Sequence, residues 1–196
     1  MTKPKFIFSV AAFFLVCLFS LTGALAQTNP PLRQAEPSYE VVLQVLTASN
    51  TAADKTAVPQ TLSGVVKKLK TNYSFSNYRL NSTYLQRVAN TGGIEFRSVS
   101  NETNQDVSTP IFSDWRLDGL QSLPNQRGQN SIQFQSFRFG QRIPIRNTSN
   151  IVNYEQIGLT IQKFGLSENT PTVIGTLPTS KPDELMFLVL TVKPEE

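Results

Sequence analysis

The sequence predicts an α+β fold that is mostly antiparallel β-sheet, with one amphipathic helix near the mature N-terminus. Three observations predict it. Apolar residues recur at every second position in several segments, the period of a strand with one buried face. Helical spacing of apolar residues is convincing only once, from Leu62 to Leu69. Residues 185–192 are apolar on both faces, as in a central buried strand or an interface strand.

The first 26 residues follow the order of a secretory signal peptide. Lys3 and Lys5 give a positive start, residues 6–21 are almost continuously apolar, and Ala24-Leu25-Ala26 has the small-x-small pattern of a cleavage site. We therefore expect residues 1–26 to be a signal peptide and the protein to be exported: periplasmic, outer-membrane-associated or secreted. A retained anchor is the alternative, because a spanning helix needs about 20 apolar residues.

A flexible tether, residues 27–37, is expected to precede a β-α-β-β unit over residues 38–100. The unit's first strand turns one apolar face inward, and Pro59 starts the helix. Strands 76–89 and 93–100 follow, joined by a tight turn in which Gly92-Gly93 supply the positive φ. The predicted core of the unit consists of Val41, Leu43, Val45, Leu62, Val66, Leu69, Leu80, Ile94 and Phe96.

Residues 101–130 are polar and poorly periodic, so we expect a connecting segment that Trp115 and the neighbouring apolar residues pin to the body. Residues 131–196 carry strand patterns throughout and are expected to form one compact domain with residues 38–100. The alternation slips at Gln135-Ser136, which predicts a β-bulge.

Composition excludes several kinds of site. The chain has no histidine, and its one cysteine, Cys17, lies in the expected signal peptide. A histidine-based catalytic triad and a zinc site built on histidine or cysteine are therefore excluded from the mature chain. We predict no catalytic residues, no metal site and no cofactor. Loss of Lys3 and Lys5 with the leader lowers the formal net charge from +4 to +2, which gives no reason to expect nucleic acid as a partner.

Two surfaces are candidates for contacts with a partner. The first is a candidate interaction strand with Leu185, Phe187 and Val189 on one face. The second is a candidate basic surface formed by Lys67, Lys68, Lys70, Arg138, Arg142 and Arg146. If the lysines and arginines converge on one face, binding of anionic lipid or lipopolysaccharide, and contact with a membrane surface, becomes an alternative function.

Residues 139–194 resemble the C-terminal core of the secretins, the ring-forming outer-membrane channels of type II and III secretion and of type IV pili. The segments that carry the resemblance are Phe139-Gly-Gln-Arg-Ile-Pro-Ile145, Tyr154-Glu-Gln-Ile-Gly-Leu-Thr-Ile161, Thr172-Val-Ile-Gly-Thr-Leu177 and Glu184-Leu-Met-Phe-Leu-Val-Leu-Thr-Val192. The chain departs from the pattern at Thr176, where secretins have a second glycine. The resemblance implies a component of an envelope complex.

Together these patterns predict an exported, non-enzymatic binding or assembly module of the bacterial cell envelope, and the resemblance implies a secretin-like or secretion-associated component. Its expected partners are other envelope proteins or further copies of itself. The alternative from a different class is an exported carboxylate-dependent hydrolase. A solvent-facing cleft that gathers Asp114, Asp118 or Glu155 with a partner carboxylate would favour the hydrolase.

Overall fold

The computed structural model describes residues 36–51, 58–101, 110–124, 130–146 and 152–195. These residues belong to one compact unit, Glu36–Glu196. The expected signal peptide and nearly all of the expected tether lie outside the described residues. Within the described ranges, no helix is long and apolar enough to cross a membrane.

Nine strands form two sheets in the described part of the chain, and every pair of neighbouring strands is antiparallel. Sheet A has the order β2-β1-β9-β8, formed by Asn77–Ala89, Ser38–Ser49, Glu184–Pro194 and Thr172–Pro178. Sheet B contains β3, β4, β5, β6 and β7, formed by Gly93–Asn101, Pro110–Asp118, Gln121–Pro124, Asn130–Arg146 and Val152–Ser167. In sheet B, β6 pairs with β4 and β5 along one edge and with β7 along the other.

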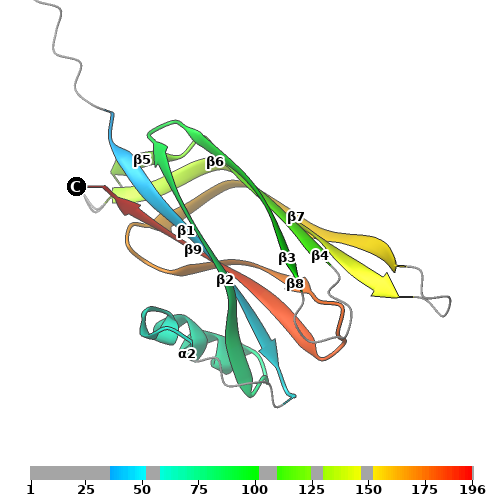
Figure 1. Ribbon diagram of the computed structural model, residues 1–196. Coiled ribbons are helices and arrows are strands. Elements are labelled where there is room, and N and C mark those ends of the chain that lie inside the picture. The colour runs from blue at the N-terminus through cyan, green and yellow to red at the C-terminus, as the bar shows by residue number, and fades with distance from the viewer. Residues whose placement is uncertain (1–35, 52–57, 102–109, 125–129, 147–151, 196) are drawn as a thin grey trace, which may run out of the picture. The chain divides into compact units, whose positions relative to one another are not determined.

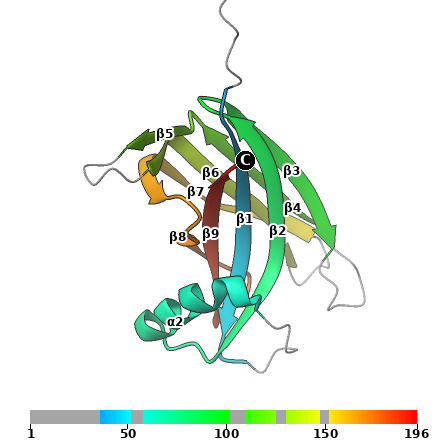
Figure 2. The same cartoon turned by 90° about the vertical axis from the view of Figure 1, so that its left-hand side faces the viewer.

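The helix and the two sheets form three layers (Figure 1). The inner faces of sheets A and B pack on each other around the larger apolar cluster. A short 3-10 turn, Gln60–Leu62, leads into helix α2, Ser63–Asn72, which covers the other face of sheet A. Figure 2 shows α2 crossing in front of β1 and β9. The predicted α+β fold, mostly antiparallel sheet with one helix, is confirmed.

The central strands of sheet A, β1 and β9, pack against sheet B on one face and against helix α2 on the other. Along β1, Tyr39, Val41, Leu43 and Val45 point into the cluster between the sheets, as their alternation predicts, while Leu46 and Ala48 point to the helix. Strand β9 lies between β1 and β8, and its residues 186–192 are buried, on one face by sheet B and on the other by α2. Of the two readings of residues 185–192, the structure shows the central buried strand.

The residues expected to form one core divide between two clusters. Val41, Leu43, Val45, Ile94 and Phe96 pack between the sheets, whereas Leu62, Val66, Leu69 and Leu80 pack under the helix. Strand β3 explains this division. It leaves β2 and pairs with β4 in sheet B, so residues 38–100 do not fold into one small sheet.

The turn between β2 and β3 differs from the expected one. Positive φ occurs at Thr91, with a φ of 63°, and at neither glycine. Gly92 is needed for space, because a Cβ there would lie 2.8 Å from Val88 Cγ2 and 2.9 Å from the Ala89 carbonyl oxygen. The Thr91 N–H donates to the Leu120 carbonyl oxygen of sheet B at 2.6 Å, which helps to direct the chain from one sheet to the other.

The segment predicted as a polar connection over residues 101–130 contains β4 and β5. Ser113, Trp115 and Leu117 are buried at alternate positions, and Asp114 and Arg116 point outward. This is the pattern of a strand with one wet face. Charged and small residues on the outer face made the strand pattern hard to recognise in the sequence. The backbone hydrogen-bonding groups of β4 pair with β3 and β6.

The alternation slips at Gln135-Ser136 without the predicted bulge. The pairing of β6 with β4, β5 and β7 keeps one register on both sides of this point. The neighbouring strands slip at the same place, at Gly119 and at Lys163, where φ is 64° and 51°. The inward-outward alternation shifts at the same position in each of these neighbouring strands. No strand therefore contains an extra residue relative to its neighbour. Sheet B therefore creases here and keeps its apolar side chains on the inside.

Replacement of Gly119 by alanine is expected to lower the free energy of unfolding by about 1–2 kcal/mol, because a side chain disfavours this left-handed backbone. A Cβ there would also meet the Gln135 side chain at 2.7 Å. Gly64→Ala is the matched control: it adds a Cβ in open space on the helix and should raise stability by about 0.5–1 kcal/mol. Urea unfolding monitored by circular dichroism measures both. Equal changes in the free energy of unfolding for the two substitutions would contradict the requirement for a left-handed backbone at Gly119.

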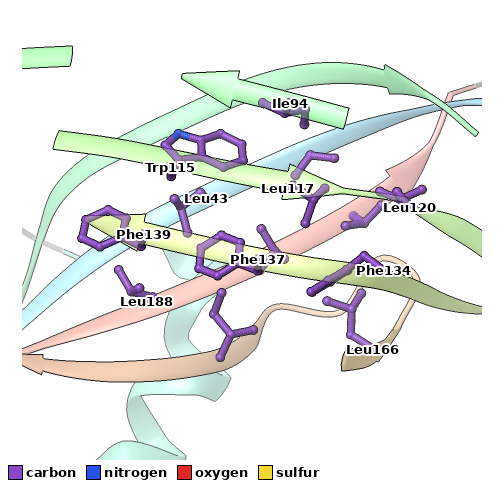
Figure 3. Close-up of a cluster of buried hydrophobic side chains, with 14 of the residues drawn as sticks. Leu43, Ile94, Trp115, Leu117, Leu120, Phe134, Phe137, Phe139, Leu166 and Leu188 are labelled. Carbon is purple, nitrogen blue, oxygen red and sulfur yellow. The ribbon is translucent and has the colours of Figure 1, made fainter. Parts of the chain in front are cut away.

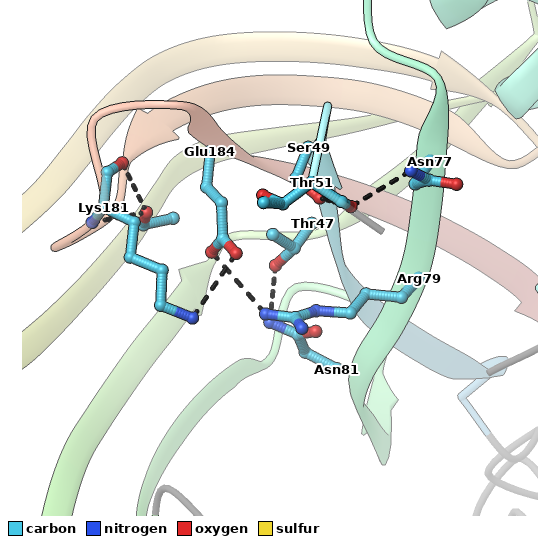
Figure 4. A network of polar contacts seen from close by, with 9 residues as sticks. Thr47, Ser49, Thr51, Asn77, Arg79, Asn81, Lys181 and Glu184 are labelled. Atoms are coloured by element: carbon cyan, nitrogen blue, oxygen red, sulfur yellow. Dashed lines mark hydrogen bonds and ion pairs between the residues drawn. The ribbon is translucent and has the colours of Figure 1, made fainter. Parts of the chain in front are cut away.

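A polar network closes one end of sheet A (Figure 4). Glu184 is buried, and its carboxylate lies 3.5 Å from both the Arg79 guanidinium and the Lys181 ammonium group. Asn81, the extra residue of a β-bulge in β2, donates to the Thr47 hydroxyl. The network joins β1, β2 and β9, and pairing with two cations compensates the burial of Glu184.

Candidate functional site

The outer face of sheet B, on the side away from sheet A, bears an open groove with a volume of 680 Å³. We call it the sheet B groove. Its lining comes from four strands: Glu95, Arg97, Ser98, Val99, Phe112, Ser113, Asp114, Trp115, Arg116, Arg138, Arg142 and Gln156. The side chains of Phe137 and Phe139 point inward from β6, so Arg138 and Arg142 at alternate positions point outward into this groove.

A row of residues that includes two glycines crosses sheet B between the walls of the groove. Strand register places Arg97, Asp114, Gly140 and Gly158 in one row across β3, β4, β6 and β7. A Cβ on Gly140 would lie 3.0 Å from Asp114 Oδ1, so the Asp114 carboxylate extends over Gly140. A Cβ on Gly158 would lie 2.5 Å from the Phe139 carbonyl oxygen. Gly140 is therefore buried beneath Asp114, whereas Gly158 is exposed, and this row carries no side chain on β6 or β7.

The first wall of the groove is the row Glu95, Arg116 and Arg138. Arg116 and Arg138 lie directly opposite each other on neighbouring strands. The Arg116 guanidinium donates to Asp118 at 2.8 Å, and the hydrogen bond and charge of Asp118 raise the pKa of Arg116. Within the part of the chain that the structure describes, no carboxylate pairs with Arg138.

The second wall is the row Val99, Phe112, Arg142 and Gln156. The Arg142 guanidinium stacks on Phe112, 4.8 Å from the ring centroid, and Tyr154 meets the same ring edge-on with centroids 5.6 Å apart. Val99 is 61% exposed, so this wall also offers apolar surface. No ion pair holds Arg142 among the residues described.

The structure separates the two halves of the candidate basic surface. Lys67, Lys68 and Lys70 are exposed on α2, which covers sheet A, whereas Arg138 and Arg142 point outward from sheet B. The backbone of Arg146 pairs with Val152 at the end of β6, and its side chain lies outside the described part. The convergence that binding of anionic lipid would require is therefore absent among the described side chains of this set.

The candidate interaction strand lies within sheet A. Phe187 and Val189 are buried under α2, and Leu185 packs against the same cluster. Both edges of β9 are paired, with β1 and with β8. A partner would reach Phe187 and Val189 only if the helix moved away, whereas Leu185 is half-buried. The sequence suggested that a partner could cover this apolar face. In the structure the helix covers it instead.

Asp114, Asp118 and Glu155 do not share one cleft, but Asp114 lies in the groove with a second carboxylate, which is the arrangement that the hydrolase alternative requires. Asp114 lies in the sheet B groove with Glu95, whose carboxylate accepts a hydrogen bond from Arg97 at 2.8 Å. Asp118 pairs with Arg116, and Glu155 lines a separate hollow beside Pro178. Within the described ranges, no group of three or more histidine, cysteine or acidic side chains is arranged to hold a metal ion.

Sequence reasoning selected two of the groove residues, Arg138 and Arg142, as part of a basic surface, and Asp114 as a candidate acid. It did not select Arg97, Arg116 or Phe112. The signal was present in the alternation: Phe112, Asp114 and Arg116 occupy every second position, and so do Arg138, Gly140 and Arg142. Recognition of β4 as a strand would have exposed this pattern.

Comparison with known proteins adds one finding. Solved structures to which the fold is similar include secretins. The type IV competence pilus secretin PilQ of V. cholerae gives a TM-score of 0.41 at 6% identity, covering 84% of this chain and 62% of that chain. The type II secretin GspD of Enteropathogenic Escherichia coli gives 0.39 at 11%, covering 98% and 74%. The Klebsiella pneumoniae outer membrane complex of PulD, PulS and PulC gives 0.39 at 10%, covering 92% and 43%.

This is the family that residues 139–194 resemble. The chain spans 62% of the PilQ chain, which is less than two thirds of it. No protein-family model matches the sequence, and no curated protein matches it. At such low identities and TM-scores the likeness does not place the chain in the secretin family.

Proposed function

We propose that this chain is an exported, non-enzymatic binding module that holds another protein against the outer face of sheet B. The observation that carries the proposal is the sheet B groove, in which Arg138 faces Arg116 across two paired strands. Like charges directly opposite each other destabilise a sheet. Such a local conflict is typical of a position that serves binding.

The composition of the groove supports a protein partner. Arginine and aromatic residues are enriched at protein interfaces, and this groove combines four arginines with Phe112 and the neighbouring Tyr154. Its rim also includes Val99, which is 61% exposed. The groove lies on the open face of a sheet, whereas sites for small molecules bury most of the ligand surface.

The sequence supports the cellular part of the proposal. The pattern of residues 1–26 is that of a leader for export, and residues 139–194 carry secretin-like segments. We therefore infer that the partner is an envelope protein or a second copy of this chain. The compartment would be the periplasm, the outer membrane or the exterior.

Site-specific crosslinking tests the proposal. A photoreactive benzoylphenylalanine at Gln156, an exposed residue of the groove, is expected to give a discrete adduct when cells that export the full chain are irradiated. The matched control carries the same residue at Lys68, exposed on the helix at the opposite layer, and should give no such adduct. Adducts from both positions alike, or from Lys68 alone, would refute the assignment of the outer face of sheet B.

A further inference from the structure

We propose that the sheet B groove binds an extended polypeptide segment in which an acidic, a basic and a second acidic residue alternate with any residue between them. The segment lies along β6, with its acidic side chains on Arg138 and Arg142 and its basic side chain on Asp114. This inference rests on the proposed function and names the chemistry of the partner.

The charges along β6 alternate in the order that such a segment requires. Arg138 and Arg142 point outward on either side of Gly140, and the Asp114 carboxylate extends over that glycine. The surface along this line is therefore positive, negative and positive. The two arginines are four residues apart, which is roughly 13 Å in a strand. An extended partner presents its first, third and fifth side chains to one face with the same spacing.

Two of the four groove arginines have no ion pair in the described part of the molecule. Arg97 is held by Glu95 and Arg116 by Asp118, each at 2.8 Å. Arg138 and Arg142 are exposed, and Arg142 is oriented by its stacking on Phe112. A guanidinium can bind a carboxylate through two parallel hydrogen bonds. Two acidic side chains of a partner could thus each pair with one of these two arginines.

Asp114 accounts for the central residue of the segment. The Asp114 carboxylate lies over Gly140, which is buried, and the neighbouring Gly158 is exposed and carries no side chain. Asp114 is an acceptor with no ion pair among the residues described. A lysine or arginine of the partner would place its cation there. The same carboxylate repels a phosphate that bridges Arg138 and Arg142, which favours a polypeptide over a lipid head group.

Binding of synthetic peptides to the exported full-length chain tests the inference, with fluorescence anisotropy as the readout. The probe is a labelled peptide with the core Glu-Ser-Lys-Ser-Glu between glycine-serine flanks. A peptide of identical composition with the core Glu-Glu-Lys-Ser-Ser, and one with the core Lys-Ser-Glu-Ser-Lys, are the controls. The probe is expected to bind at least ten-fold more tightly than either control.

Substitutions in the protein sharpen the test. Arg138→Ala and Arg142→Ala should each weaken binding of the probe about five-fold to ten-fold, whereas Lys68→Ala on the helix should leave it unchanged. Asp114→Asn should weaken the probe and strengthen a peptide with the core Glu-Ser-Glu-Ser-Glu. This reversal is not expected from a loss of folding, and circular dichroism of each variant checks the fold.

Equal binding of the three cores, or no effect of the arginine substitutions, would overturn the inference. If vesicles of anionic phospholipid displace the labelled peptide, and the three peptides bind with the same affinity, the groove is assigned to lipid instead. If crosslinking at Gln156 yields an adduct while the peptides fail, the inference fails and the proposed function stands. If both experiments fail, both proposals fail.

Discussion

Replacement of Trp115 by alanine is expected to lower the free energy of unfolding by about 3–5 kcal/mol, the range for loss of a large buried aromatic side chain. Trp115 is 1% exposed and lies between the sheets, with ring centroids 6.3 Å from Phe96 and 6.4 Å from Phe137. Figure 3 shows it above Leu43 of sheet A. The side chain therefore joins both sheets, and its loss leaves a cavity at their interface.

Trp115→Phe distinguishes the contribution of ring packing to stability from that of the polar indole N–H. The indole Nε1 is buried without a hydrogen-bond partner among the described residues, so phenylalanine removes an unsatisfied donor together with part of the volume. We expect Trp115→Phe to cost about 1 kcal/mol. Because Trp115 is the one tryptophan of the chain, circular dichroism in urea replaces fluorescence as the measurement. A phenylalanine variant as unstable as the alanine variant would show that the indole nitrogen has a partner.

Replacement of Phe187 by alanine is expected to have an effect of similar size, about 3–5 kcal/mol, through the layer beneath the helix. Phe187 is fully buried in the face of β9 that α2 covers. The Tyr73 ring meets it edge-on with centroids 4.9 Å apart, and the Tyr78 centroid lies 6.3 Å away. Loss of the ring removes the main aromatic contact between sheet A and the segment that follows the helix.

Hydrogen exchange locates the effect of Phe187→Ala. Amides of α2 should lose protection before those of β4 and β6, because the helix depends on this cluster alone. Leu85→Ala, at a strand residue that is 53% exposed, is the control and should change stability by less than about 0.5 kcal/mol. Peptide binding at the sheet B groove should persist in folded Phe187→Ala protein. A uniform loss of protection across both sheets would show that the helix does not unfold as a separate unit.

The candidate site was only partly accessible from sequence. The alternation of β6 places Arg138 and Arg142 on one face, and the sequence alone shows this. It does not show that Arg116 lies beside Arg138, because strand pairing joins residues far apart in the chain. It also grouped the helix lysines with the arginines by charge. The structure divides them because sheets A and B lie between these two sets of side chains.

The sequence by itself determined the local features of this protein. The inward face of β1, the helix from Ser63 to Asn72 and the burial of β9 follow from periodicity, because burial of one face or both leaves a direct mark on the residue pattern. Only the tertiary structure shows that β3 pairs in sheet B and that the helix covers Phe187. It also assembled the groove, because pairing and layer contacts are long-range choices that periodicity does not encode.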